Sequence, residues 1–273
     1  NEESMKKVLA VVLATALSLC CLVGCGSNPE EGKENVTTPA PEVTTTAEPS
    51  PTEEPTPTEA PVQQEKKSDA AIMVVSFGTS YNDSRDITIG ALEAAVEKAY
   101  PEYEVRRAFT SQIIIDVLKD RDNLVIDNVT EALDKAVADG IKELIVQPTH
   151  LMNGFEYNDL AVELTRYMDK FDKIVMAEPL LMSDGDFDAV VKAITEATAS
   201  YDNGETAICF MGHGTEAPSN SVYATLQDKL VAAGYENYYI GTVEGAPTLE
   251  DVGAALKAKG TYKKVVLQPL MVV

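Results

Sequence analysis

The sequence of 273 residues predicts an α/β fold with parallel sheets flanked by helices. Short segments that are apolar throughout alternate with longer segments whose apolar residues recur every three or four positions. Continuously apolar strands are typical of parallel sheets that helices cover on both faces. The pattern begins near residue 68 and restarts after residue 203, so we expect a first lobe at 68–203 and a second at 204–273.

The first lobe opens with the apolar run 70–75, which predicts a buried strand that ends just before Ser76. Asp83 or Ser84 can cap the helix that follows, and Pro101 stops it. The same patterns predict further strands at 103–107, 144–146 and 174–177, and helices at 112–119, 128–138, 159–171 and 187–199.

The second lobe repeats this order of elements. Its predicted strands are 207–210, 238–243 and 264–267, and its predicted helices are 222–232 and 249–257. Two landmarks indicate a duplication: Phe77-Gly78-Thr79 resembles His213-Gly214-Thr215, and Ile145–Pro148 resembles Val266–Pro269. The landmarks lie 70 residues apart in the first lobe (78 to 148) and 55 in the second (214 to 269), so chance similarity between α/β units is the alternative.

Residues 1–25 have the pattern of an export signal. Lys6 and Lys7 precede the apolar run 8–23, and small residues lead to Cys25. This resembles a bacterial lipoprotein signal, which implies a lipid on Cys25 and an exported protein anchored to the membrane. An uncleaved transmembrane anchor is the alternative, although the run of 16 residues is shorter than the roughly 20 that a spanning helix needs.

Residues 26–67 are expected to be a disordered stalk, because they hold eight of the fourteen prolines, eight threonines and nine glutamates. Residues 68–273 carry 33 acidic and 17 basic residues, a net charge of −16, so the folded part is acidic by itself. Such a chain lacks the clustered Lys and Arg that nucleic acid or an anionic membrane surface requires. We therefore expect no nucleic-acid partner.

Both histidines of the chain follow predicted strands, His150 after 144–146 and His213 after 207–210. Ligands of parallel α/β sheets collect beyond the carboxyl ends of the strands, and an imidazole there can ligate a metal or accept a proton. Glu178 and Glu244 also follow strands and are candidates for the same site. The alternatives are a hydrogen-bonded histidine at a strand end, a histidine in a glycine-shaped loop, and surface carboxylates.

Several common motifs are missing from the sequence. It contains neither a phosphate-binding P-loop nor GxGxxG, so we expect no nucleotide cofactor. It contains no GxSxG of a serine hydrolase and no CxxC pair of a zinc site.

Ordered motifs across residues 70–273 resemble the anaerobic sirohydrochlorin cobaltochelatases. They are Val74–Tyr81, Arg107–Ser111, Thr149–Gly154, Phe210–Gly214, Val243-Glu244 and Leu267–Val272. The resemblance implies a class II chelatase with two Rossmann-like lobes and a tetrapyrrole cleft between them. Such an enzyme inserts cobalt(II) into sirohydrochlorin for cobalamin synthesis without ATP, and iron(II) or nickel(II) are alternative metals.

The resemblance also implies roles for individual residues. His150 and His213 would bind the metal and accept the pyrrole protons, and Glu178 would be a third metal ligand. The implied substrate contacts are Ser76, Phe77, Gly78, Thr79, Phe109, Thr110, Ser111, Gly212, Gly214 and Glu244.

Three expectations follow from setting this family beside the rest of the sequence. The family continues past the last apolar strand, so we expect the second lobe to be truncated at Val273. Sirohydrochlorin carries eight carboxylates, so Arg85, Arg106 or Arg107 must offset the acidic field, or the substrate is a less acidic porphyrin.

Export of the chain favours a haem-, tetrapyrrole- or metal-binding lipoprotein without turnover as the alternative function, with an importer's solute-binding lipoprotein as a weaker one. Homo-oligomerisation stays open.

Overall fold

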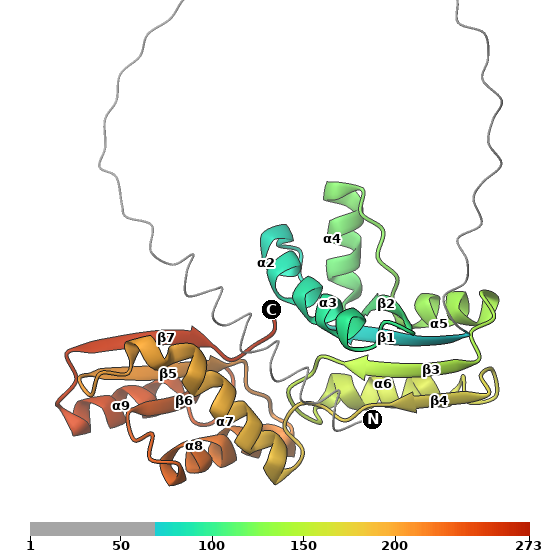
Figure 1. The fold of residues 1–273 in the computed structure, drawn as a ribbon. Coiled ribbons are helices and arrows are strands. Elements are labelled where there is room, and N and C mark those ends of the chain that lie inside the picture. The colour runs from blue at the N-terminus through green and yellow to red at the C-terminus, as the bar shows by residue number, and fades with distance from the viewer. Residues whose placement is uncertain (1–68) are drawn as a thin grey trace, which may run out of the picture.

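The computed structural model describes residues 69–273, which form two lobes, each built on its own sheet (Figure 1). The first sheet has the strand order β2-β1-β3-β4 and the second has the order β6-β5-β7, and every pair of neighbouring strands is parallel. The predicted α/β class with parallel sheets is therefore confirmed. The proposed signal, the lipidation site Cys25 and the stalk lie outside the described residues.

The first lobe contains strands β1 (Ala70–Ser76), β2 (Glu104–Phe109), β3 (Glu143–Pro148) and β4 (Lys173–Met176). Its helices are α2 (Asn82–Ile87), α3 (Ile89–Ala99), α4 (Gln112–Asp122), α5 (Val129–Ala138) and α6 (Phe155–Thr165). The second lobe contains β5 (Thr206–Gly212), β6 (Tyr238–Thr242) and β7 (Lys264–Pro269), with helices α7 (Asp184–Thr198), α8 (Val222–Ala232) and α9 (Leu249–Lys259). Within residues 69–273, none of the helices has the length and apolar character to cross a bilayer.

Side chains that alternate along β1 build a core on each face of the first sheet. Ala71, Met73 and Val75 pack against α5 and α6, whereas Ile72 and Val74 pack against Val96 of α3. In the second sheet, Ile208 and Phe210 of β5 pack against α7 and α8, and Cys209 packs against α9. Central strands that are buried on both faces explain why the sequence shows continuous apolar runs there.

The helix expected before Pro101 is two helices. It begins at Asn82, with Tyr81 at its N-cap and no side-chain cap from Asp83 or Ser84, so that expectation was wrong. It breaks at Thr88, whose hydroxyl donates a 2.6 Å hydrogen bond to the carbonyl of Ser84. A β-branched threonine that bonds back to the preceding turn favours such a local break.

The helix expected at 159–171 was also misplaced, because α6 runs from Phe155 to Thr165. Beyond Thr165, the backbone N–H groups of Arg166 and Tyr167 donate to carbonyls only three residues earlier. This tightening ends the helix, and the buried Phe171 reaches the core from the bend before β4 instead.

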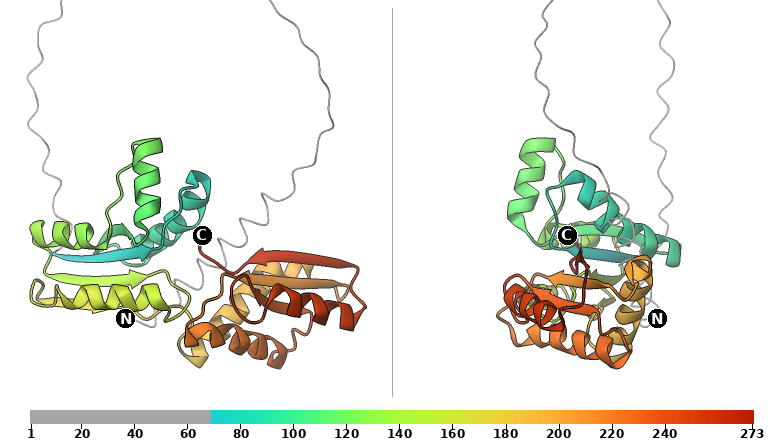
Figure 2. Two further views of the ribbon diagram at one scale, coloured as in Figure 1. Left: turned by 180° about the vertical axis from the view of Figure 1, so that it is seen from behind. Right: turned by 90° about the vertical axis from the view of Figure 1, so that its left-hand side faces the viewer.

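Helix α7 falls before residue 203 but packs in the second lobe. Phe187, Val190 and Ile194 share a core cluster with Phe210 of β5 and Leu226 of α8. Figure 2 shows α7 beside the second sheet in both views. The helices that cover the second sheet therefore begin with α7, before residue 204, where the sequence pattern repeats.

Strand register shows that the two lobes match residue by residue. Val75 pairs with Pro148 in the first sheet, and Met211 pairs with Pro269 in the second. Gly78 and Gly214 each follow three residues later, with φ of 99° and 85°. The landmarks of the sequence are thus structurally equivalent, although in the described part of the chain no strand lies beside β7 as β4 lies beside β3.

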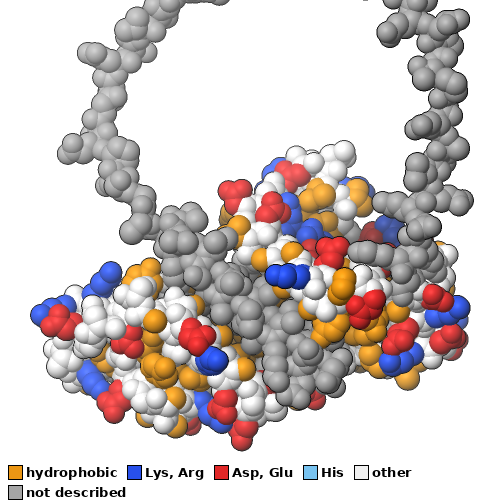
Figure 3. Space-filling view, in the orientation of Figure 1, with side chains coloured by type: hydrophobic (Ala, Val, Ile, Leu, Met, Phe, Trp, Pro, Cys, Tyr) orange, Lys and Arg blue, Asp and Glu red, His pale blue; other side chains and the backbone are white. Residues whose placement is uncertain are grey.

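Apolar side chains join the lobes. Leu92 of α3 and the segment Leu180-Leu181 belong to the core cluster of the second lobe. Val272, after β7, packs against that cluster and also against the cluster of the first lobe that contains Phe109. On the face drawn in Figure 3, acidic and basic side chains are interspersed with apolar ones over both lobes.

Candidate active site at the carboxyl ends of the strands

Every described residue that the sequence analysis proposed for the site lies at the end of a strand or in the loop after it. The first lobe contributes the ends of β1, β2, β3 and β4, and the second contributes the ends of β5 and β6. Carboxyl ends of parallel strands share one edge of each sheet, so each lobe presents one functional edge.

The edge of the first lobe is held by buried polar and aromatic contacts. The hydroxyl of Thr149, after β3, donates to the hydroxyl of Ser76 at 3.0 Å, and both side chains are buried. Gly78 lies against the fully buried Phe109, since a Cβ on Gly78 would fall 2.6 Å from its Cδ2 atom. The hydroxyl of Thr79 accepts from the backbone N–H of Tyr81 at 3.2 Å. These contacts fix the path of the loop and leave Phe77 half-exposed.

Two further site residues lie between β2 and α4. Ser111 is the N-cap of α4, and its hydroxyl accepts from the backbone N–H of Ile114 at 3.5 Å. Thr110 has a buried hydroxyl without a hydrogen-bond partner among the described residues. The backbone N–H of Ser111 donates to the carbonyl of Phe77 at 3.2 Å, so the loops after β1 and β2 are tied together.

His150 has a ring that is withdrawn from solvent. Its Nδ1 and Nε2 atoms are both buried, and neither has a hydrogen-bond partner among residues 69–273. Burial lowers the pKa of His150 from its ordinary 6.5, against an opposing attraction from Glu156. The imidazole is therefore neutral at neutral pH and has a free lone pair, which a metal ion or a proton can use. Its carbonyl accepts from the backbone N–H of Leu180, which ties it to the segment that bears Glu178.

His213 differs, because its side chain is 65 % exposed. Its Nδ1 atom lies 3.1 Å from the carbonyl oxygen of Gly214 and 3.8 Å from a carboxylate oxygen of Glu244. The backbone N–H of Glu244 donates to the carbonyl of His213 at 2.8 Å. The loops after β5 and β6 therefore bring a histidine and a carboxylate together at the surface.

The glycines beside His213 are required by close packing. A Cβ on Gly212 would fall 2.2 Å from the Cε1 atom of Tyr223, and a Cβ on Gly214 would fall 2.6 Å from the backbone nitrogen of Gly245. The hydroxyl of Tyr223 accepts from the backbone N–H of Gly214 at 3.3 Å. Tyr223 was not among the residues predicted for the site, and the only signal of a bulky neighbour was the pair of glycines on either side of His213.

The proposed metal set of His150, His213 and Glu178 is not gathered in the structure. Among residues 69–273, no three His, Cys, Asp or Glu side chains lie close enough to hold one ion. The structure brings His213 to Glu244, whereas His150 and Glu178 belong to the first lobe. Of the proposed donors, only His213 and Glu244 are thus shown side by side, on the second lobe.

The arginines considered for offsetting the acidic field already have partners. Arg107 forms an ion pair with Glu93, which raises the pKa of its guanidinium, whereas Arg106 pairs with Asp139 and Glu104. The two side chains leave β2 toward opposite faces, as the strand pattern predicts. Arg85 is buried and donates to the side chain of Asn82 at 2.7 Å.

Comparisons with known proteins converge on one family. A family profile described as cobalt chelatase (CbiK) matches residues 70–273. A sirohydrochlorin cobaltochelatase of Salmonella typhimurium strain LT2 is 34 % identical over 203 residues, which is 74 % of this chain and 76 % of that protein. The sirohydrochlorin cobaltochelatase CbiKC of Nitratidesulfovibrio vulgaris strain Hildenborough is 32 % identical over 202 residues, 73 % of this chain and 70 % of that protein.

A solved structure of the sirohydrochlorin chelatase SirB from Bacillus subtilis subspecies spizizenii, in complex with cobalt, covers 73 % of this chain and 86 % of its own. It is 15 % identical, with a TM-score of 0.44. The resemblance stated from the sequence motifs is confirmed by the profile and the two sequence relatives: the chain belongs to the cobalt chelatase (CbiK) family.

Proposed function

We propose that the folded part of this chain inserts cobalt(II) into sirohydrochlorin. Membership of the cobalt chelatase family supports the reaction class, and two relatives are named as enzymes for this metal and this tetrapyrrole. The observation that carries the proposal to particular residues concerns His150. Both of its ring nitrogens are buried and have no hydrogen-bond partner within the described chain, and burial lowers the pKa of the imidazole, which is neutral at neutral pH.

The reaction makes two demands on the protein. A hydrated divalent ion must lose water molecules, and two pyrrole N–H groups of the macrocycle must lose their protons. One Co²⁺ enters as two H⁺ leave, so charge is conserved and the chain needs no nucleotide for the exchange. Imidazole suits both steps, because it ligates cobalt, iron or nickel and accepts a proton near neutral pH.

The two histidines suit different parts of this exchange. His213 is exposed and has the carboxylate of Glu244 beside it, which suits capture of the hydrated ion. The ring nitrogens of His150 are buried and its imidazole is neutral, which suits acceptance of pyrrole protons and the final ligation of the ion before transfer. Glu178, in the segment after β4, would be a third ligand that joins only when substrate is bound.

An anaerobic insertion assay tests this proposal. Sirohydrochlorin is mixed with cobalt(II) and the purified protein, and the change of the tetrapyrrole absorption spectrum is followed. We expect turnover by the wild type and a loss of at least about a hundredfold in His150→Ala and in His213→Ala, since general acid–base groups contribute that much. Glu216→Ala is the matched control, because it removes a charged side chain from the same loop as His213.

The alternative function is a tetrapyrrole- or metal-binding protein without turnover. The export signal expected at residues 1–25 favours it. Tight binding of haem or sirohydrochlorin by the wild type, with no metal insertion, would establish the alternative. No binding of metal or tetrapyrrole would refute both functions.

We also propose that Cys25 carries a lipid and that the protein acts at the cell surface or in the periplasm. The proposal rests on the residues before Cys25 and on the composition of residues 26–67. Labelling of cells with a radioactive fatty acid tests it: the wild type should incorporate label into the membrane fraction, and Cys25→Ala should not. Sedimentation of the purified protein would decide whether it is a homo-oligomer.

A further inference from the structure

Helix α4 and the loop 77–81 after β1 form a single wall at the functional edge of the first lobe. At one end, the backbone N–H of Ser111 donates to the carbonyl of Phe77 at 3.2 Å. At the other end, the guanidinium of Arg121 donates to the carbonyl of Ser80. Two ties about ten residues apart along α4 hold the loop against the helix, which extends away from the sheet beside α2 (Figure 1).

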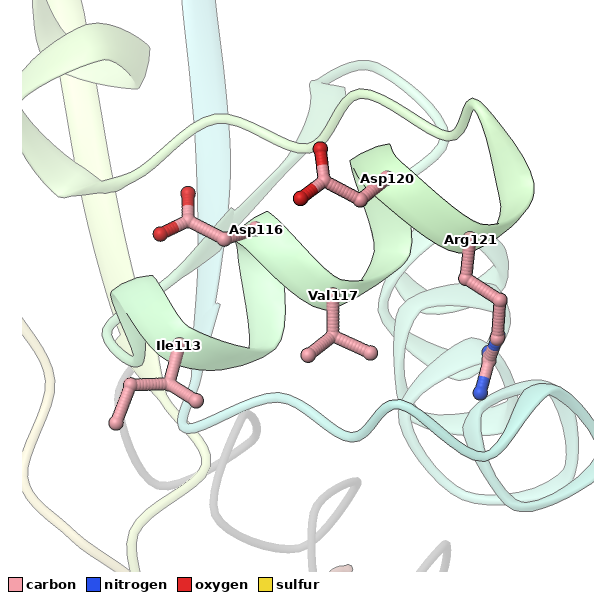
Figure 4. A pocket seen from close by; sticks show the side chains of 5 residues that line it. All are labelled: Ile113, Asp116, Val117, Asp120 and Arg121. Atoms are coloured by element: carbon pink, nitrogen blue, oxygen red, sulfur yellow. The ribbon is translucent and has the colours of Figure 1, made fainter.

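Apolar side chains of α4 are left uncovered on this wall. Ile113 and Val117, one helical turn apart, are 76 % and 38 % exposed. They line a hollow of about 470 Å³ together with Asp116, Asp120 and Arg121. Figure 4 shows Ile113, Val117 and Arg121 pointing toward the loop, whereas Asp116 and Asp120 point away from it.

Folding of the lobe does not explain this exposed row. On the side of α4 that faces the core, Ile115 and Leu118 provide the apolar contacts, which they make with Ile89 and Phe109. On the loop side, Phe77 and Tyr81 are exposed as well, at 48 % and 75 %. Apolar side chains from two elements thus meet at one edge, and patches of this kind mark binding sites.

The charges around this edge disfavour recognition of carboxylates. Across the described chain, the loops 77–81, 110–111, 149–154, 177–183, 213–221 and 243–248 contain no Lys or Arg. They contain three glutamates, Glu178, Glu216 and Glu244. The nearby Arg121 forms a 2.6 Å ion pair with Asp122, so its charge is already matched.

We propose that Ile113 and Val117 are a contact surface for the ring face of the tetrapyrrole, and that the carboxylates of the macrocycle point into solvent. This inference rests on the proposed function and adds how the substrate is selected: by its apolar ring, not by ion pairs to its periphery. A carboxylate-rich ring and a less acidic porphyrin would then differ little in affinity at physiological salt.

Binding of a metal-free tetrapyrrole to Ile113→Asp tests the contact. Aspartate at the second residue of α4 favours the helix dipole, so this variant keeps its fold. We expect its dissociation constant for sirohydrochlorin, read from the quenching of tetrapyrrole fluorescence, to rise about tenfold or more, because an apolar contact is replaced by a charge. Val162→Asp is the matched control: it lies inside α6, is 58 % exposed, and should bind as the wild type does.

Salt dependence tests the second half of the proposal. These loops hold no cation and Arg121 of the hollow is paired with Asp122. Raising the ionic strength should therefore screen mainly the repulsion between carboxylates of the site and the substrate, so affinity should stay constant or rise. A steep fall of affinity with salt would reveal ion pairing and overturn the inference. The inference would also be overturned if Ile113→Asp bound tetrapyrrole as tightly as the wild type while metal insertion proceeds. A wild type that binds no tetrapyrrole would instead refute the proposed function itself.

Discussion

The Nδ1 atom of His213 lies 3.8 Å from a carboxylate oxygen of Glu244, and the backbone N–H of Glu244 donates to the carbonyl of His213. The same backbone bond joins Ser111 to Phe77 in the first lobe, at 3.2 Å. His213 therefore occupies the position of Phe77, and Glu244 that of Ser111. The same backbone arrangement therefore carries a phenyl ring and a hydroxyl in the first lobe. In the second lobe it carries an imidazole, which can ligate a metal, and a carboxylate.

Glu244→Gln should weaken metal binding at His213. A carboxylate beside an imidazole helps to orient the ring toward an incoming ion, and removal of such a partner typically costs about tenfold to a hundredfold in metal affinity. We expect a loss near the lower end of this range, because both side chains are about two-thirds exposed. Cobalt(II) titration of the wild type, Glu244→Gln and Glu216→Gln measures it, and equal losses in the two variants would show a general effect of charge instead.

The sequence was sufficient for the fold class and for placing the candidate residues at the ends of strands, because buried parallel strands leave uninterrupted apolar runs. It could not give the pairing of His213 with Glu244. That pairing depends on the register of β5 and β6, in which Gly212 pairs with Thr242. Register is set by packing across the sheet, which a single sequence does not display.

The expectations that the structure contradicts also have physical causes. The break at Thr88 comes from a side-chain hydrogen bond that helix periodicity does not record. The packing of α7 in the second lobe comes from contacts of Phe187 and Val190 with residues far along the chain. The spacing of apolar residues predicted the position of α7 along the chain, but it does not indicate which of the two sheets the helix covers.

The protonation of His150 should occur below its ordinary pKa. Burial lowers the pKa of its imidazole from 6.5, so the folded protein resists protonation where the unfolded chain accepts it. The free energy of unfolding should therefore fall as the pH drops below about 6.5 and continue to fall until the folded-state pKa is reached. Titration of the imidazole signals by NMR in the metal-free protein measures the shift directly.

Glu156→Gln provides the internal comparison for His150. The carboxylate of Glu156 favours the imidazolium, so its removal should lower the pKa of His150 further. Insertion activity of this variant should extend to lower pH than that of the wild type. A pKa of His150 at or above 6.5 in the wild type would contradict the burial of the ring.

Thr149→Val should destabilise the first lobe by about 1–3 kcal/mol, because it leaves the buried hydroxyl of Ser76 without its partner. The double variant Ser76→Ala/Thr149→Val removes both polar groups and should recover part of that loss. Urea unfolding of the two single variants and the double variant completes a cycle. Strict additivity of the two single losses would mean that the 3.0 Å hydrogen bond contributes nothing.

Gly78→Ala should be the more damaging of two substitutions at glycines with positive φ. Gly78 and Gly204 have φ of 99° and 78°, so alanine costs about 1–2 kcal/mol at each from backbone conformation. At Gly204 a Cβ meets nothing within 4 Å, whereas at Gly78 it falls 2.6 Å from a carbon of the buried Phe109 ring.

The clash at Gly78 should therefore add about 1–3 kcal/mol, the usual cost of overpacking a filled core. Urea unfolding of Gly78→Ala and Gly204→Ala separates the two contributions, and equal losses would show that Phe109 moves aside freely. Because Phe109 also supports the loop that carries Phe77 and the N-terminal end of α4, Gly78→Ala should weaken tetrapyrrole binding as well. Gly204→Ala lies away from that edge and should leave binding unchanged, so the pair of variants ties the rigidity of the loop to its capacity to hold the substrate.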